Sequence, residues 1–365
     1  MGANAFWLGQ IHYDASNWQA TQPEFVRYYQ YSQRMYELAP DNLDAIMELS
    51  YATNSLGSLA MQRQQFDKAR QSFEESLQLR LLAQAKQPEN KQLLADIANT
   101  RSWLASAALA QGDIARALTV HNEIQRMLVT AGENAELYLL EMLASSYQMS
   151  ADLFGFTGQT TAALANVNSA DTVIRRALAQ DPDNSRWRNL KYYVFYQLLK
   201  FSLDLSEQEV KQSPSQLISL LSRDGLDLSA TREQQMQARQ LLTAAQRLII
   251  KGNLQSAKTY AEQALSTYEL LVANHSGNLR NRAGKANSYL VLARITENKD
   301  LLATHQFCQH AIDELADIVA INKEPDFTVP YAQALDCQGK LNSESELIAQ
   351  LQQSGVVNYR FNPQL

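Results

Sequence analysis

Apolar side chains recur along most of this chain at the three- and four-residue spacing of amphipathic helices. The clearest apolar stripes are Ile97, Leu104, Ala108 and Leu109, and Leu241, Ala245, Leu248 and Ile249. Ala, Leu, Gln, Glu and Arg, which lose little entropy in a helix, are abundant, whereas the 365 residues include only 13 glycines and 8 prolines. The chain is therefore predicted to be all-α.

Breaks between the helical stretches recur with a period of about 47 residues. One kind of break contains Asn or Asp, usually with Pro. It reads APDN at 39–42, QPEN at 87–90, AGEN at 131–134, DPDN at 181–184, HSGN at 275–278 and KEPD at 323–326. Asn and Asp can cap the following helix, and Pro prevents the preceding helix from continuing. These segments are predicted to join one repeat to the next.

A second kind of break lies inside each repeat, for example RQQFDKA at 63–69 and QGDIARA at 111–117. Its small residues suit the left-handed backbone at the end of a helix; they are Gly112, Gly158, Gly252 and Gly339. Two alternating breaks mean two helices per repeat. We predict eight antiparallel helix pairs, starting near residues 5, 43, 91, 135, 185, 232, 279 and 326.

The segment 54–77, NSLGSLAMQRQQFDKARQSFEESL, resembles a tetratricopeptide repeat. It has Leu56, Gly57, Ala60, Ala69 and Phe73 in that family's order, and segments 103–124 and 242–265 follow it. Small residues at the positions of Gly57, Ala105 and Ala245 allow helices to approach closely. The resemblance implies a right-handed α-solenoid that binds a protein or peptide in its concave groove without catalysis.

The repeats are longer than the usual 34 residues of that family, mainly because the second helix is longer, as at 67–86. Such long repeats resemble the C-terminal regions of large bacterial signalling proteins. The fifth pair is irregular, because Pro214 and Gly225 interrupt its second helix. We therefore expect an N-terminal array at 1–205, a break or hinge at 206–235 and a C-terminal array at 236–365.

The charge and hydropathy of the chain argue against some classes of partner. A net charge of -6 without a dense Lys/Arg cluster argues against nucleic-acid binding. No apolar run reaches the roughly 18 to 20 residues that span a bilayer, so no direct membrane insertion is expected. The N-terminus does not follow the pattern of a signal peptide. The chain is interpreted as a fragment of a longer protein, either cytoplasmic or the periplasmic part of a membrane-anchored one.

Candidate chemistry is sparse. His305 and Cys308 share a helix face, but His310 points elsewhere and no fourth zinc ligand is in sight. Cys308 and Cys337 lie in adjacent predicted helices, where they form either one disulfide or two small buried side chains. No phosphate-binding loop, nucleophile elbow or metalloprotease helix occurs. We expect no metal, no cofactor and no enzymatic activity.

The groove is the remaining candidate site, because the first helix of each pair lines the concave face of a tetratricopeptide solenoid. Counting back from the inner turns predicts Tyr51, Asn54, Asn99, Ser102, Ser145, Gln148, Asp152, Tyr193, Tyr196, Lys200 and Arg239 on this face. Such amide, hydroxyl and tyrosine side chains suit peptide recognition. The aromatic-rich segment 191–201 is the strongest candidate, with Tyr192 and Phe195 expected in the core. The early repeats lack the basic residues that would hold the acidic tail of a chaperone.

Three functions remain open. The first is a protein- or peptide-binding scaffold or sensor in a bacterial signalling protein. The second is a structural spacer or self-association module, which would form a homodimer through its apolar terminal repeats. Those ends carry Phe6, Trp7 and Leu8, and Val356, Val357, Tyr359 and Phe361. The third is a small-molecule or peptide-pheromone sensor. A pocket enclosed on most sides near Tyr196 would favour the third, and a strict monomer would exclude self-association.

Overall fold

A computed structural model describes residues 2–130, 136–201, 231–342 and 345–361. Among these residues the chain forms fifteen α-helices and no strand, which confirms the all-α prediction. The first six are α1 (Gly2–Asp14), α2 (Trp18–Leu38), α3 (Leu43–Gln62), α4 (Phe66–Lys86), α5 (Lys91–Ala110) and α6 (Ile114–Val129). The others are α7 (Leu137–Phe156), α8 (Thr160–Gln180), α9 (Ser185–Phe201), α11 (Thr231–Ile250), α12 (Leu254–Asn274), α13 (Leu279–Thr296), α14 (Leu301–Ile321), α15 (Pro325–Cys337) and α16 (Glu346–Gln353).

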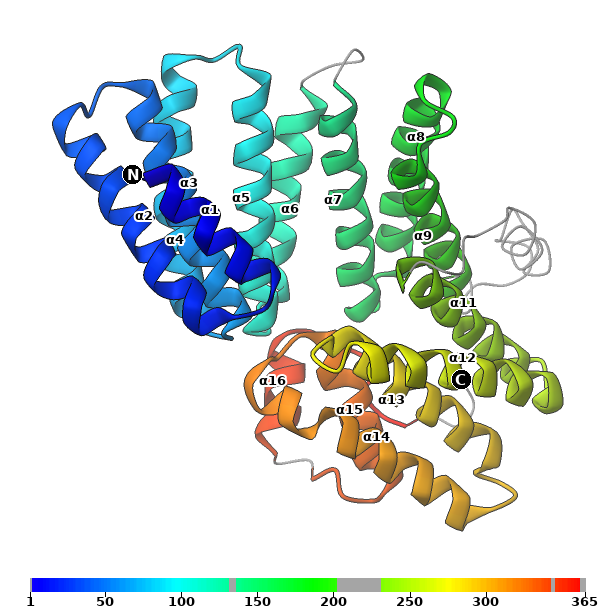
Figure 1. The fold of residues 1–365 in the computed structure, drawn as a ribbon. Helices are drawn as coiled ribbons and strands as arrows, with labels where there is room; N and C mark the ends of the chain where they lie inside the picture. The colour runs from blue at the N-terminus through cyan, green and yellow to red at the C-terminus, as the bar shows by residue number, and fades with distance from the viewer. Residues whose placement is uncertain (1, 131–135, 202–230, 343–344, 362–365) are drawn as a thin grey trace. The chain divides into compact units, whose positions relative to one another are not determined.

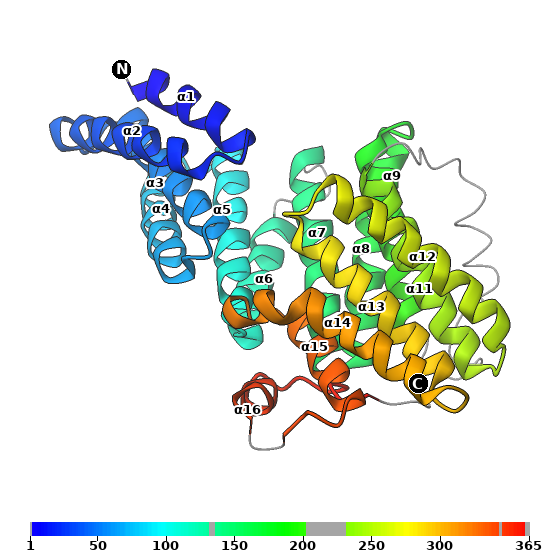
Figure 2. The ribbon, with the colours of Figure 1, turned by 60° about the horizontal axis from the view of Figure 1, so that its bottom comes forward.

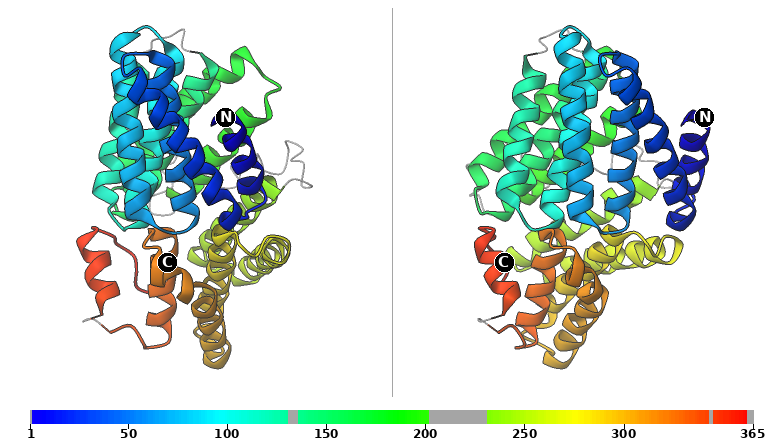
Figure 3. Two further views of the ribbon diagram at one scale, coloured as in Figure 1. Left: turned by 60° about the vertical axis from the view of Figure 1, so that its left-hand side comes forward. Right: turned by 90° about the vertical axis from the view of Figure 1, so that its left-hand side faces the viewer.

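The helices form two compact units, residues 1–146 (unit 1) and residues 147–365 (unit 2), with the division inside α7. Within each unit, helices that follow one another in the chain pack together, as α3 does on α4 and α11 on α12. Figures 1 and 3 show the helices of unit 1 side by side, and Figure 2 shows α11 to α14 in the same relation within unit 2. This order of packing is that of a helix-pair repeat.

The first helices of the eight pairs are α1, α3, α5, α7, α9, α11, α13 and α15, and each begins within about three residues of its predicted start. The second helix of the fifth pair would lie at 202–230, outside the described residues. The predicted break at 206–235 lies there too, apart from its last residues, which belong to the first turn of α11. The predicted domain division at this break therefore stays a prediction.

Both kinds of turn act as predicted. The side chains of Asn42, Asn90, Asn184 and Asn278 accept hydrogen bonds from backbone N–H groups in the first turns of α3, α5, α9 and α13. The predicted turn at 131–134 is outside the described residues. Side-chain caps satisfy donors that the helix cannot use itself, so they fix where each repeat begins.

Most of the described inner turns have left-handed backbone at one position, but the turn between α13 and α14 has none. The φ angles of Gly112, Gly158, Gly252 and Gly339 are 83°, 70°, 75° and 64°. Gln64, in the corresponding turn of the second pair, has φ 56°. A residue with a Cβ is strained in this region and glycine is not, which explains the glycines that revealed the repeat.

The first helices of successive repeats also hydrogen-bond to one another. Tyr51 Oη lies 3.1 Å from Asp96 Oδ2, 45 residues later. Gln235 Nε2 donates to Asn281 Oδ1 at 2.6 Å, 46 residues later. These bonds stack one repeat on the next with the period found in the sequence.

The helix register predicted at 54–77 is confirmed by the packing of Gly57. Phe73 is fully buried, and a Cβ added to Gly57 would lie 2.6 Å from its ring. The equivalent small residues Ala105 and Ala245 are also buried. The helices therefore approach closely where the sequence has no large side chain.

The C-terminal segment, residues 354–361, returns across unit 2. The N–H of Val357 donates to the carbonyl of Phe156 in α7 at 2.9 Å, and Gln333 of α15 donates to the carbonyl of Asn358 at 2.6 Å. The segment thus connects the last helix pair to α7, the first helix of the unit.

This return corrects the expectation of a free apolar C-terminal end. Val356 is only 4% exposed, and Phe361 packs against the core of α13 to α15. Only Val357, 39% exposed, remains an exposed apolar side chain. At the N-terminal end, Trp7 and Leu8 are exposed as expected, whereas Phe6 packs on Tyr28.

Cys308 of α14 and Cys337 of α15 form a disulfide, with their Cα atoms 6.3 Å apart. Of the two alternatives left open by the sequence, a disulfide or two separate buried thiols, the structure has the disulfide. It takes the Cys308 sulfur out of any metal site with His305. None of the described helices is both long and apolar enough to span a membrane.

Candidate functional site

A cavity of about 330 Å³ lies in unit 2, where the first helices of five pairs converge with α12 and the C-terminal segment. Its charged and aromatic lining residues are Asp152 and Phe156 of α7, Tyr193, Tyr196, Lys200 and Phe201 of α9, Arg239 of α11, Tyr268 of α12, Arg280 and Arg294 of α13, and Asp326 of α15. Amides of Asn287, Gln333 and Asn358 also contribute. The cavity wall thus combines charged, amide and aromatic groups with apolar side chains such as Leu242, Val291 and Val329.

One side of the cavity is organised around Lys200. Residues 193, 196 and 200 are three and four apart on α9, so they share one helix face. Lys200 Nζ lies 3.2 Å from Asp152 Oδ1, and Tyr193 donates to Asp152 Oδ2 at 2.5 Å. The ammonium also lies 5.1 Å and 5.3 Å from the ring centres of Phe156 and Phe201, within the range of cation–π attraction.

These contacts set the protonation of the cluster. Burial alone would lower the pKa of Lys200, but Tyr196, Asp152 and Asp326 more than offset it, so its pKa lies above the usual range. Burial, together with the Asp152 charge, raises the pKa of Tyr193 well above its usual value. At neutral pH, Lys200 is an ammonium, and Tyr193 is a neutral hydroxyl that donates a hydrogen bond to Asp152.

Arg280 is also in the cavity wall, and it pairs with two carboxylates. Its guanidinium lies 2.9 Å from Asp326 Oδ2 and 3.0 Å from Glu324 Oε2. Burial would raise the pKa of Asp326, but Arg280, Lys200 and Arg239 lower it below its usual value. Asp326 is thus an ionised carboxylate surrounded by cations.

Arg239 and Arg294 also line the cavity. The charge of Asp326 favours the protonated form of Arg239, which also hydrogen-bonds to Tyr268, and the charge of Glu297 favours the protonated form of Arg294.

Arg239 lies 6.0 Å from the ring centre of Tyr193. Arg294 donates to Gln333 Oε1 at 3.2 Å and lies 5.6 Å from the ring centre of Phe361, while its Nε has no hydrogen-bond partner in the described part of the chain. Burial lowers the pKa of Arg294 to about 10.

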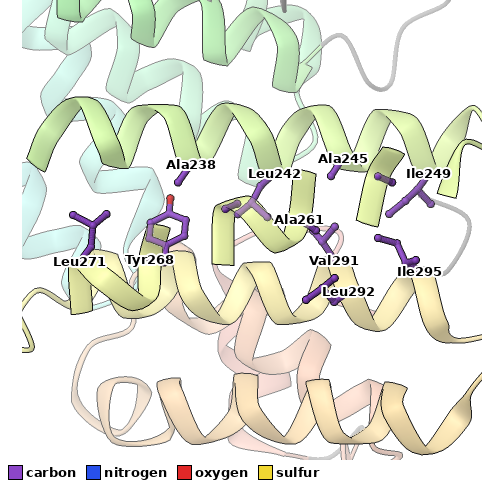
Figure 4. Packing of buried hydrophobic residues seen from close by; sticks show 12 residues of the cluster. Ala238, Leu242, Ala245, Ile249, Ala261, Tyr268, Leu271, Val291, Leu292 and Ile295 are labelled. Atoms are coloured by element: carbon purple, nitrogen blue, oxygen red, sulfur yellow. The ribbon is translucent and has the colours of Figure 1, made fainter. Parts of the chain in front are cut away.

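Two glycines let aromatic rings reach the cavity. A Cβ on Gly284 would lie 2.2 Å from the Tyr268 ring, and one on Gly155 would lie 2.4 Å from the Phe201 ring. Figure 4 shows the Tyr268 hydroxyl pointing toward the helix that carries Ala238, the neighbour of Arg239. Burial raises the pKa of Tyr268 to about 12, and the Arg239 charge offsets part of the rise.

Five of the predicted groove residues come together around this cavity: Asp152, Tyr193, Tyr196, Lys200 and Arg239. Tyr192 and Phe195 are buried in the core, as expected. The role of the five in ligand binding stays a prediction, but their common location is a property of the structure.

The other predicted groove residues lie elsewhere. Gln148 is 4% exposed and donates to the carbonyl of Leu190 at 2.8 Å, so its amide connects α7 to α9 and does not face a ligand. Ser145 is half-buried on α7.

The four remaining candidates belong to unit 1. Tyr51 is held by Asp96, Asn54 is half-buried, and Asn99 and Ser102 are exposed on α5. They line no part of the unit 2 cavity.

Four further wall residues were not predicted from the sequence: Tyr268, Arg280, Arg294 and Asp326. Tyr268 is on a second helix, which a groove built only from first helices excludes. The signal for it was Gly284, because a glycine inside a helix costs stability and often marks a close approach. Arg294 and the C-terminal segment meet through contacts distant in sequence, which no local pattern indicates.

No family model matches the chain, and no curated protein matches it either. Among solved structures, yeast Tom70 is 14% identical over 97% of this chain and 84% of its own, with a TM-score of 0.38. BtubC from P. vanneervenii is 12% identical over 79% and 90%, with a TM-score of 0.31. A circular tandem repeat protein is 15% identical over 97% and 93%, with a TM-score of 0.32. At such values these are partial likenesses from which no function follows.

Proposed function

We propose that this chain is a non-catalytic binding module of the tetratricopeptide type, whose unit 2 cavity holds a short peptide or a small molecule. The observation that supports this most is the convergence of Asp152, Tyr193, Tyr196, Lys200 and Arg239 on one cavity. These residues come from three helices, α7, α9 and α11, that are well separated in the sequence. Binding here is a matter of shape, hydrogen bonds and charge.

The size of the cavity favours the sensor function over an extended scaffold. Its volume is at the lower end of the roughly 300–1,000 Å³ typical of small-ligand sites. Tyr196 is in its wall, and the returning segment around Asn358 borders it. A ligand of a few residues suits this space better than the surface of a folded protein.

Two observations bear on the cellular compartment of the proposed sensor. The long repeats resemble those of bacterial signalling proteins, which favours a sensor attached to an output domain. The Cys308–Cys337 disulfide favours an oxidising compartment. Together they favour the periplasmic part of a membrane-anchored receptor over a cytoplasmic protein.

The test is a screen of an arrayed tetrapeptide library for peptides that raise the melting temperature. Asn287→Trp places a large ring in the cavity wall, and Asn99→Trp makes the same change on the exposed face of α5. We expect stabilising peptides to act on the wild type and on Asn99→Trp but not on Asn287→Trp. Peptides that still stabilise Asn287→Trp would locate binding elsewhere, and a library without any stabilising peptide would contradict a peptide ligand.

A second function, self-association, is favoured by the apolar surface of the first helix pair. Trp7, Ile11 and Leu38 are 63%, 64% and 72% exposed. Light scattering tests it directly. A dimer that Trp7→Glu converts to a monomer would support it, and a wild-type monomer at high concentration would exclude it.

A further inference from the structure

Residues 357–361, which we call the C-terminal strap, border the unit 2 cavity. Val357 and Asn358 are part of the cavity wall. The strap follows Val356, which is 4% exposed and whose N–H donates to the carbonyl of Leu351 in α16 at 2.9 Å. Val356 is therefore fixed to α16, and a movement of the strap would pivot just beyond it.

The end of α7 holds the first residue of the strap. The Val357 N–H donates to the carbonyl of Phe156 at 2.9 Å, and Phe156 is the last residue of α7, where carbonyls lack an intrahelical donor. The Val357 side chain lies over Gly158, where an added Cβ would be 2.9 Å from it. Val357 is nonetheless 39% exposed. Water could hydrogen-bond to the same carbonyl if the strap left.

Asp336 of α15 holds the other end of the strap by two contacts. Its Oδ1 accepts from Arg360 Nη1 at 2.7 Å, and its Oδ2 accepts from the Phe361 N–H at 2.9 Å. The Arg360 side chain is 50% exposed and that of Asp336 23%, so water competes for both groups and the ion pair contributes little. Among the described residues that form the cavity wall, neither of the two occurs, so both can be changed without altering the wall.

We propose that the strap is a gate, which closes one side of the cavity and detaches to admit a ligand, an inference that rests on the proposed binding function. Detachment would withdraw Val357 and Asn358 from the wall and free the Gln333 amide that donates to Asn358. It would also take the Phe361 ring from its place 5.6 Å from the Arg294 guanidinium. The polar groups left behind would face water or the ligand, and the helices of the wall would keep their packing.

A single thiol in the cavity wall measures access without any ligand. The two cysteines of the chain form the Cys308–Cys337 disulfide, so Asn287→Cys adds one free thiol, located in the wall. Its rate of reaction with benzyl methanethiosulfonate, a neutral reagent, reports how often the cavity is open. Asn99→Cys, on the exposed face of α5, gives the rate of an unprotected thiol.

Two substitutions loosen the strap, and each is combined with Asn287→Cys. Arg360→Ala should raise the rate of thiol modification about two- to fivefold, because it removes an exposed ion pair. Asp336→Ala should raise it about tenfold, because it also removes a hydrogen-bond acceptor. Hydrogen exchange at the Val357 amide should accelerate by the same factors. Lys258→Ala, which breaks an exposed ion pair on α12 outside the wall, should change neither rate.

The outcomes distinguish the gate from the binding function. Faster exchange at Val357 without faster thiol modification would show that the strap moves but does not control access, and would overturn the inference. Unchanged exchange would overturn it too, since these contacts would not hold the strap. Neither result affects the peptide screen, which tests binding separately. A thiol that responds as expected in a protein that binds no peptide would support the gate and refute the binding function. Arg360→Ala changes only an exposed side chain, so the test remains decisive even if Asp336→Ala does not fold.

Discussion

The ring of Tyr268 occupies the space in which a side chain at Gly284 would lie. A Cβ on Gly284 would be 2.2 Å from two atoms of the ring. Tyr268 is nonetheless fully buried and reaches the cavity wall from a second helix. Because Gly284 of α13 has no Cβ, the ring of Tyr268 from α12 can lie in the cavity wall.

Gly284→Ala is expected to displace this ring. Overpacking of a well-packed core costs about 1–3 kcal/mol, more than the up to about 1 kcal/mol gained from helix propensity. We expect a lower melting temperature and weaker binding of any peptide found for the cavity. Gly2→Ala is the matched control, since a Cβ there meets Tyr31 at an ordinary 3.6 Å. A Gly284→Ala protein as stable as the wild type would show that Tyr268 moves aside without cost.

Gly57→Leu tests the same principle in unit 1, at the contact with Phe73. The large side chain should force α3 from α4 and lower the free energy of unfolding by roughly 1–3 kcal/mol. Because repeats contact only their neighbours, hydrogen exchange should accelerate mainly in α3 to α6. Peptide binding in unit 2 should be unchanged. Uniform acceleration throughout both units would contradict the assigned register.

The positions of the repeats could be predicted because their signals are local. Asn42 caps α3 and Gly112 ends α5 through interactions within a few residues, so sequence spacing alone reveals them. The face of α9 could also be predicted, since Tyr193, Tyr196 and Lys200 share one helical stripe. These features need only the geometry of a single helix.

The closure of the cavity could not be predicted, because it depends on contacts distant in sequence. Val357 hydrogen-bonds to Phe156, and Phe361 packs under Arg294. An apolar terminal segment has the same composition whether it is free or folded back. Gln148 shows the converse, since its helical position suits the groove but the neighbouring carbonyl of Leu190 takes its donor.

The Cys308–Cys337 disulfide should stabilise unit 2 by closing a loop across α14 and α15, whose cysteines are 29 residues apart. Loop-closure entropy for such a length corresponds to roughly 3.6 kcal/mol. Reduction by dithiothreitol should therefore lower the melting temperature of the wild type. The double variant Cys308→Ala/Cys337→Ala should start lower and not respond to dithiothreitol. An equal response of both proteins would mean that the reductant acts elsewhere.

His121 should make the protein acid-sensitive. It is 4% exposed, its Nδ1 lies 3.1 Å from Ser146 Oγ, and burial lowers its pKa from 6.5 to about 4. Above pH 6.5 the folded and unfolded chains both hold it neutral, so it adds no pH dependence. Between pH 6.5 and about 4 the unfolded chain binds a proton that the folded chain does not, so stability falls as the pH falls.

A shift of this size corresponds to a loss of about 3 kcal/mol once the pH is below 4. Denaturant unfolding at pH 7, 5.5 and 4.5, monitored by hydrogen exchange in unit 1, measures how the free energy of unfolding changes with pH. His121→Gln cannot take up the proton, so its curve should be flatter over this range even if its stability at pH 7 is lower. His275→Gln, at an exposed position, should keep the wild-type slope. If His121→Gln keeps the wild-type slope as well, protonation of His121 does not cause the acid sensitivity, and other groups do.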